Sequence, residues 1–236
     1  MSLLDRASDP QQYDKEAIYW EREREDHSPW MDFYKGYILP SIEDIKGAKI
    51  LDIGSGTGWL LEDVRSRGAV KVVGIEPSER NVTLARQHYP KVQTLLSSFE
   101  DYEDIDRYNY IFALMSFVHM GNVQSAMKKV AGLLGVKGSF RMIVPDFDYA
   151  KAPRFGYELE VESLTDNEYV ARTERPTVTT VDIVRGVEVY TTAAMEAGMS
   201  LEKSMPVLPT TDLLQAKPQY EQFRDRAIAQ MLWFSC

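Results

Sequence analysis

The sequence predicts an α/β protein built on a doubly wound sheet, and three observations support that class. Short apolar runs that fit buried strands alternate with segments whose apolar residues recur at helical spacing. The strands are almost continuously apolar, which is typical of a parallel sheet covered by helices on both faces. One of these runs, residues 50–53, leads directly into a loop with glycines at positions 54, 56 and 58.

The central half of the chain contains the alternating units. The expected strands are 49–53, 71–76, 92–96, 108–115 and 139–144. The expected helices are 59–67, 78–88 and 122–134, with Ser78 as an N-cap and a turn at 135–138. Together these segments predict one parallel sheet with a helix after most of its strands.

The pattern differs on either side of this core. Residues 9–46 are rich in aromatic and charged side chains, and we expect helices there. After Pro145 the residues alternate between polar and apolar, which predicts an antiparallel hairpin. The elements expected beyond Pro145 are hairpin strands at 157–164 and 168–173, a helix at 184–197 closed by Gly198, an extended segment at 199–207, an interrupted helix at 212–226 and a last strand at 229–235.

The composition fits a globular protein whose ligand is a small molecule. Hydrophobic residues make up 44% of the 236 residues and charged residues 27%, which is ordinary for globular domains. The net charge of −9, from 36 acidic against 27 basic residues, disfavours binding along a phosphate backbone. We therefore expect a small-molecule substrate and no nucleic acid.

The cysteine content and the lack of long apolar runs point to a cytoplasmic protein without a membrane partner. No apolar run approaches the roughly 18 residues that a membrane span needs, and the N-terminus lacks the apolar core of a signal peptide. The one cysteine, Cys236, excludes a disulfide framework and a cysteine-ligated zinc site within the chain.

The loop Gly54-Ser-Gly-Thr-Gly58 is the clearest candidate binding site. Glycines let the backbone lie directly against a ligand, and a loop between a buried strand and a helix N-terminus is typical of nucleotide-type sites. A dinucleotide fingerprint needs Gly-x-Gly-x-x-Gly, and this spacing fails at Trp59. A nicotinamide-dependent oxidoreductase is therefore a disfavoured alternative. No Lys-Ser/Thr pair follows the glycines, so a P-loop is excluded.

In this loop and in later motifs the chain resembles the class I S-adenosylmethionine-dependent methyltransferases, most strongly over residues 45–145. The first motif is Asp-x-Gly-x-Gly-x-Gly at 52–58, and the second is the acid that ends the next strand, Glu76. After the third strand, Ser98-Phe99-Glu100 has serine in place of the family's usual aspartate. Asn109 likewise replaces the aspartate that begins the family's fourth strand.

This resemblance implies a fold and a division of the chain. The fold is a Rossmann-like doubly wound sheet, mostly parallel with an antiparallel last strand. A single methyltransferase domain over residues 1–236 would comprise an N-terminal helical lid (1–46), a cofactor-binding core (47–145), a hairpin cap over the substrate (146–183), and C-terminal helices and antiparallel strands (184–236).

The resemblance also implies S-adenosyl-L-methionine as the cofactor and S-adenosyl-L-homocysteine as the product. In the family the glycine loop wraps the methionine portion, the acid after strand two binds the ribose hydroxyls, and the residues after strand three hold the adenine. The cofactor-binding residues predicted on this basis are Asp52, Gly54, Ser55, Gly56, Gly58, Glu76, Pro77, Ser98, Phe99, Met115 and Ser116. For Asp52 we keep two interpretations open, contact with the cofactor or bracing of the loop.

The expected reaction is in-line transfer of a methyl group to a small-molecule acceptor at oxygen, nitrogen or carbon. Such a displacement depends on alignment and exclusion of water, and it needs no metal. His119, just after the fourth strand, is the candidate base for an acceptor that enters protonated. Its other interpretation is a packed residue at a helix start. The alternative function is a non-catalytic subunit that binds the cofactor and regulates a partner.

Two further groups of side chains are candidates for the substrate side. Tyr13, Tyr19 and Trp20 belong to the expected lid, where aromatic rings could exclude water from the site. Asp146, after the fifth strand, either faces the substrate or caps the turn that follows Pro145.

Overall fold

The computed structural model describes residues 3–7, 12–15, 17–18, 21, 29–43, 45–175 and 178–236. Within these ranges the strands form a seven-stranded sheet and a separate three-stranded sheet. None of the described helices is both long and apolar enough to cross a membrane.

The seven-stranded sheet is mostly parallel, as predicted. Its strands are β1 (Lys49–Ile53), β2 (Lys71–Glu76), β3 (Gln93–Leu96), β4 (Tyr108–Leu114), β5 (Leu134–Pro145), β9 (Ser200–Val207) and β10 (Ala229–Ser235). They are arranged in the order β3-β2-β1-β4-β5-β10-β9. The first five pair in parallel, and β10 is antiparallel to both of its neighbours. The carboxyl ends of β1, β2 and β4 therefore meet at one edge.

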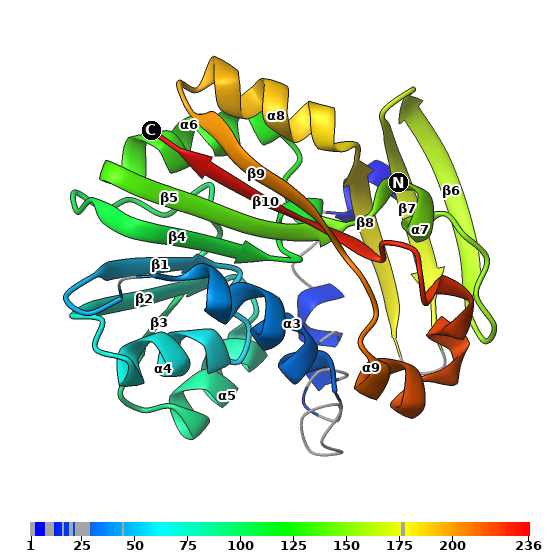
Figure 1. The fold of residues 1–236 in the computed structure, drawn as a ribbon, viewed down its shortest axis with the longest axis horizontal. Coiled ribbons are helices and arrows are strands. Elements are labelled where there is room, and N and C mark those ends of the chain that lie inside the picture. The colour runs from blue at the N-terminus through cyan, green and yellow to red at the C-terminus, as the bar shows by residue number, and fades with distance from the viewer. Residues whose placement is uncertain are drawn as a thin grey trace.

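Helices cover both faces of this sheet. Among the described residues, the helices are α1 (Leu3–Ala7), α3 (Trp30–Ile38), α4 (Trp59–Ser66), α5 (Glu79–His88), α6 (Val123–Leu133), α7 (Phe147–Ala150), α8 (Val187–Glu196) and α9 (Thr211–Ala216), with 3-10 turns η1 (Leu39–Ser41), η2 (Phe117–His119) and η3 (Pro218–Phe223). Figure 1 shows α3, α4 and α5 on one face and α6 with α8 on the other.

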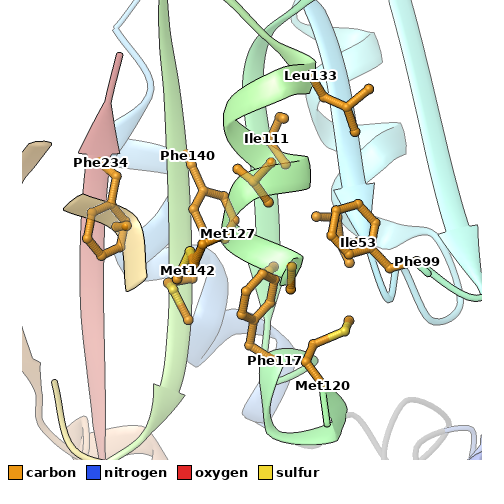
Figure 2. Close-up of a cluster of buried hydrophobic side chains, with 14 of the residues drawn as sticks. Ile53, Phe99, Ile111, Phe117, Met120, Met127, Leu133, Phe140, Met142 and Phe234 are labelled. Atoms are coloured by element: carbon orange, nitrogen blue, oxygen red, sulfur yellow. The ribbon is translucent and has the colours of Figure 1, made fainter. Parts of the chain in front are cut away.

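Each face of the sheet carries its own apolar core. On the α6 side, Met127 lies beside the sheet residues Ile111 and Phe140 (Figure 2). The ring of Phe140 is 5.3 Å from that of Phe117 and 6.1 Å from that of Phe234, measured between centroids. Burying one such side chain contributes about 1.5–3 kcal/mol to folding. These contacts fix η2 against the sheet.

The elements expected in the core agree with the structure to within a few residues. β1, β2 and β10 have the predicted bounds. Ser78 caps α5, because its hydroxyl accepts a hydrogen bond from the N–H of Asn81 at 3.1 Å. Gly198 follows α8 with φ +84°, as a residue that ends a helix in the left-handed conformation does.

Two expectations need correction. The predicted turn at 135–138 lies inside β5, which begins at Leu134: Tyr108 pairs with Leu134, and Tyr110 pairs with Ser139 after a register shift. The predicted hairpin, β6 (Glu158–Thr165) and β7 (Glu168–Glu174), has a third strand, β8 (Thr179–Arg185). Val184, the expected start of a helix, therefore belongs to a strand, because the alternating pattern continues as far as the N-cap of α8 at Gly186.

A hydrogen-bonded cluster closes the amino edge of the large sheet. The carboxylate of Asp104 accepts hydrogen bonds from the hydroxyls of Tyr108 and Tyr102 at 2.6 and 2.8 Å, and from Lys71 Nζ at 3.3 Å. The N–H of Asp106 also donates to it, at 2.9 Å. Burial acts to raise the pKa of Asp104, but these donors outweigh burial and lower the pKa below its ordinary 3.8. The cluster thus ties β2 and β4 to the loop that leads from β3 into β4.

We predict that Asp104→Asn lowers the free energy of unfolding at neutral pH by about 1.5–3 kcal/mol, because hydrogen bonds to a charged group are lost. A depressed folded-state pKa contributes stability above the unfolded pKa and loses it as the pH falls. The loss of stability between about pH 6 and pH 3 should accordingly be shallower in the variant than in the wild type. Urea unfolding at several pH values measures both effects.

The matched control is Asp166→Asn, in the exposed β6–β7 turn. We expect it to leave both the stability and its pH dependence unchanged. Equal pH dependence in wild type and Asp104→Asn would contradict the role assigned to this carboxylate.

Candidate functional site

A large cavity lies where the carboxyl ends of β1, β2 and β4 meet. Its volume is about 730 Å³, within the usual range for small-molecule sites. The glycine loop and the end of β2 form one side, and η2 and β8 contribute to the lining farther along. The edge of a doubly wound sheet at which its strands end is the expected position for a ligand.

The three loop glycines have two different roles. All have positive φ angles: 69° at Gly54, 52° at Gly56 and 82° at Gly58. No atom lies within 4 Å of where a Cβ of Gly56 would sit, and Gly56 lines the cavity. Gly58 is not part of the lining; a Cβ there would lie 3.3 Å from Cβ of Ala85. Gly58 therefore allows α4 and α5 to pack closely, while Gly56 leaves room for a ligand.

Glu76 holds the loop in place from the end of β2. One carboxylate oxygen accepts a hydrogen bond from the N–H of Gly56 at 2.8 Å, and the other accepts from the N–H of Ser78 at 3.0 Å and from Nδ2 of Asn81 at 3.3 Å. Burial raises the pKa of this carboxyl, and the three donors act against that rise. Glu76 also lines the cavity, and a carboxylate oxygen can accept more than one hydrogen bond.

Several buried polar atoms of the described cavity lining lack a protein partner. They are Oδ1 of Asp52, Oγ of Ser55 and Oδ1 of Asn81. Leaving a buried polar atom unpaired costs about 1–3 kcal/mol, so such a group in a cavity wall suggests an absent hydrogen-bonding ligand. Burial, with a contribution from the nearby charge of Glu76, raises the pKa of Asp52 to about 8. Hydrogen-bond donors on a ligand would pair these atoms, and a positive charge on the ligand would favour the ionised form of Asp52.

The remaining predicted cofactor residues also lie around the cavity. Pro77, Ser98, Phe99, Met115 and Ser116 all line it. The hydroxyl of Ser98 donates to Asp101 at 2.7 Å, and that of Ser116 donates to the carbonyl of Ile53 at 2.6 Å. Ser116 thereby braces the end of β1. Met115 has a φ of 59°, a conformation that is uncommon outside glycine.

His119, in η2, lines the same cavity and lies near Asp182 of β8. Its Nδ1 is 3.2 Å from the carbonyl oxygen of Ala7 and 3.9 Å from Oδ1 of Asp182. The ring of Tyr13 packs edge-on against it at a centroid distance of 4.8 Å. Burial lowers the pKa of His119, although Asp182 and the Ala7 carbonyl oppose that effect. The imidazole is therefore neutral at pH 7 and can accept a proton.

The other residues predicted for the substrate side have different outcomes. Tyr13 lines the cavity, whereas Tyr19 and Trp20 lie outside the described residues. Asp146 caps the turn after Pro145: its carboxylate accepts hydrogen bonds from the N–H groups of Asp148 and Tyr149 at 3.1 and 3.0 Å.

Some cavity residues, which come from α3, from β8 and from the end of β7, were not predicted from the sequence. They are Trp30, Tyr34, Arg175, Thr180 and Asp182. Thr180 and Asp182 could have been recognised from the sequence, because residues two apart in a strand face the same side. Val181 and Ile183 pack with Ala7, so Thr180 and Asp182 point the other way.

Comparison with known proteins agrees with this geometry. Residues 50–138 match the family model described as a methyltransferase domain. A solved structure of an S-adenosylmethionine-dependent methyltransferase from Listeria monocytogenes superposes with a TM-score of 0.71 at 19% identity, covering 87% of this chain and 98% of that one. Residues 50–138 thus resemble a methyltransferase domain, and the chain has the fold of S-adenosylmethionine-dependent methyltransferases. The family's cofactor is S-adenosylmethionine, and the unpaired acceptors and the open space at Gly56 fit it.

Curated relatives of this methyltransferase domain have varied names. A ubiquinone biosynthesis O-methyltransferase from Bradyrhizobium diazoefficiens is 28% identical over 102 residues, 42% of this chain and 40% of that protein. A tRNA U34 carboxymethyltransferase from Campylobacter hominis is 27% identical over 139 residues, 55% of this chain and 49% of that protein. The chain thus spans less than half the length of these relatives.

We predict that S-adenosylmethionine binds more tightly as the pH rises toward 8. Asp52, with its pKa of about 8, is mostly protonated at pH 6 to 7, and binding a cation next to it favours its ionised form. The dissociation constant should therefore fall by up to about tenfold per pH unit below pH 8. Calorimetric titrations in buffers of different ionisation enthalpy measure the affinity and count the released proton.

Asp52→Asn serves as the control, because it keeps the shape of the side chain. Any pH dependence that comes from ionisation of the ligand itself remains in this variant. The pH dependence that is specific to Asp52 should disappear in this variant. An affinity that does not change between pH 6 and pH 8 in the wild type would contradict the prediction.

Proposed function

We propose that the chain transfers a methyl group from S-adenosylmethionine to a small-molecule acceptor. The observation that carries this proposal is the continuous cavity, with unpaired acceptors of Asp52, Ser55 and Asn81 in one part and His119 with Asp182 in another. A subunit that only bound the cofactor would not need the second part. The chain's net charge of −9 favours a small acceptor over a nucleic acid.

In this proposal the cofactor would be held by the residues that line the loop side of the cavity. Glu76 and Asn81 suit the ribose hydroxyls, and Ser98 with Phe99 suits the adenine. When bound, S-adenosylmethionine supplies a methyl group on a sulfonium sulfur; the acceptor's lone pair forms the new bond to the methyl carbon as the carbon–sulfur pair returns to sulfur. The walls of the cavity exclude water and align the acceptor.

His119 is proposed as the general base for an acceptor that enters protonated, such as a hydroxyl. A neutral imidazole whose Nδ1 donates to the Ala7 carbonyl carries its lone pair on Nε2. The nearby carboxylate of Asp182, 3.9 Å from Nδ1, would stabilise the imidazolium that forms when the proton arrives. Asp182 therefore acts as a positioning residue in this scheme.

The η2 turn that carries His119 is fixed by a buried arginine from β8. Arg185 donates hydrogen bonds to the carbonyl oxygens of Phe117 at 3.3 Å and Met120 at 2.8 Å. Its Nε donates to Glu168 Oε1 at 2.8 Å. The small sheet thereby holds His119 and Asp182 at a constant separation.

We predict that His119→Asn lowers turnover by about 10²–10⁴-fold, the usual contribution of a general base. The affinity for S-adenosylhomocysteine should not change, because the cofactor residues are untouched. Only the neutral imidazole accepts a proton, and burial lowers the pKa of His119. The wild-type rate should therefore hold at pH 7 and fall only below the ordinary value of 6.5, with this acid limb absent in the variant. Methyl transfer from labelled S-adenosylmethionine to an acceptor found by screening measures the turnover and its pH dependence.

A matched control is His88→Asn, at the exposed end of α5, which should behave as the wild type. Wild-type turnover in His119→Asn, or a loss of thermal stability without a loss of turnover, would show that His119 has a packing role.

A further inference from the structure

A smaller second cavity of about 110 Å³ adjoins the main one, and we refer to it as the annex. Both cavities are lined by Trp30, Tyr34, Met115, Arg175 and Asp182, so they meet at these side chains. Asp182 in turn neighbours His119. The annex therefore opens onto the part of the main cavity in which the proposed chemistry takes place.

Several aromatic rings line the annex. Tyr220 packs edge-on against Trp30 at 5.2 Å and is stacked on Tyr149 at 6.3 Å, between centroids. The hydroxyl of Tyr220 lies near those of Tyr149 and Tyr157. Because the rings of Trp30, Tyr220 and Tyr149 pack against one another, they keep their orientation. A slot bounded by fixed aromatic faces and edges favours a flat aromatic ligand over a flexible one.

Two guanidinium groups give the annex a positive character within an acidic chain. Arg154 lies over the ring of Tyr149 at 4.6 Å and over that of Tyr157 at 5.5 Å. Arg175 lies 5.7 Å from the Tyr157 ring, and its Nη1 is 3.5 Å from Oγ1 of Thr180. Asp182 is the acidic residue among the described annex lining. A guanidinium stacked on a ring keeps in-plane N–H donors, which match the two oxygens of a carboxylate.

We propose that the acceptor is an aromatic acid, whose ring occupies the annex and whose carboxylate binds Arg175 together with Arg154. This inference rests on the proposed function and adds the class of substrate. A hydroxyl or amino group on the ring would then face the junction with the main cavity, toward His119 and the cofactor. The acceptor's lone pair takes the methyl group, and its proton passes to His119, so the transfer needs no oxidant or reductant.

The test is calorimetric titration of the full chain, first with S-adenosylhomocysteine and then, on that complex, with hydroxybenzoate and aminobenzoate isomers and the amide of each. An acid and its amide have the same ring and nearly the same shape, so the pair isolates the carboxylate. We expect at least one acid to bind tenfold or more tightly than its amide. Cyclohexanecarboxylate, which lacks the aromatic ring, should bind more weakly than benzoate.

The arginines are tested by Arg175→Gln and Arg154→Gln, with Arg172→Gln on β7 as the matched control. Each of the first two should weaken binding of the acid by at least tenfold and leave the affinities for the amide and for S-adenosylhomocysteine unchanged. Arg172→Gln should change none of these. The acid–amide comparison in the wild type needs no variant, so it holds even if a variant fails to fold.

The outcomes separate this inference from the proposed function. If S-adenosylhomocysteine binds but acids and amides bind equally, or neither binds, the aromatic-acid inference is wrong and the methyltransferase proposal stands. If S-adenosylhomocysteine does not bind, the proposed function itself fails.

Discussion

The site is built around two buried carboxyl groups near the carboxyl ends of neighbouring strands. Asp52 and Glu76 are 3% and 5% exposed. Burial raises the cost of ionising both carboxyl groups, and the charge of Glu76 raises it further for Asp52. Glu76 recovers part of that cost through the N–H groups of Gly56 and Ser78, and this in turn sets the shape of the glycine loop. Oδ1 of Asp52 has no such partner. The fold therefore keeps an under-satisfied carboxyl group in the cavity wall, whose ionised form a cationic cofactor with several donors would stabilise.

The two sheets supply different groups of residues around this position. The large sheet provides the loop and the acids, and the small sheet supplies Thr180, Asp182 and the buried Arg185. Because Arg185 donates to carbonyl oxygens on both sides of His119, the small sheet and η2 move as one unit. The part of the cavity around His119 is thus made by the segments with the weakest family pattern. Members of one fold can in this way share a cofactor and differ in acceptor.

The sequence predicted the cofactor side far better than the acceptor side, for a physical reason. Strand, glycine loop and acid are local patterns, so β1, Gly56 and Glu76 could be placed from neighbouring residues alone. Gly58, which belongs to the same predicted loop, does not line the cavity, because it lies against Ala85 where two helices meet. The pair of His119 and Asp182 joins residues far apart in the sequence, and β8 was not recognised as a third strand. The annex rings come from α3, α7, the loop after α7 and η3, and no local pattern brings them together.

The most direct test of the account is calorimetric titration with S-adenosylmethionine of three proteins: the wild type, Gly56→Val and Gly47→Val, with NADH as a control ligand. Both glycines have positive φ and open space at the Cβ position, so the two variants carry similar backbone strain, but only Gly56 lines the cavity. The account predicts micromolar binding by the wild type and by Gly47→Val, a loss of at least tenfold in Gly56→Val, and no binding of NADH. Equal affinity in Gly56→Val, or no binding by the wild type, would contradict it.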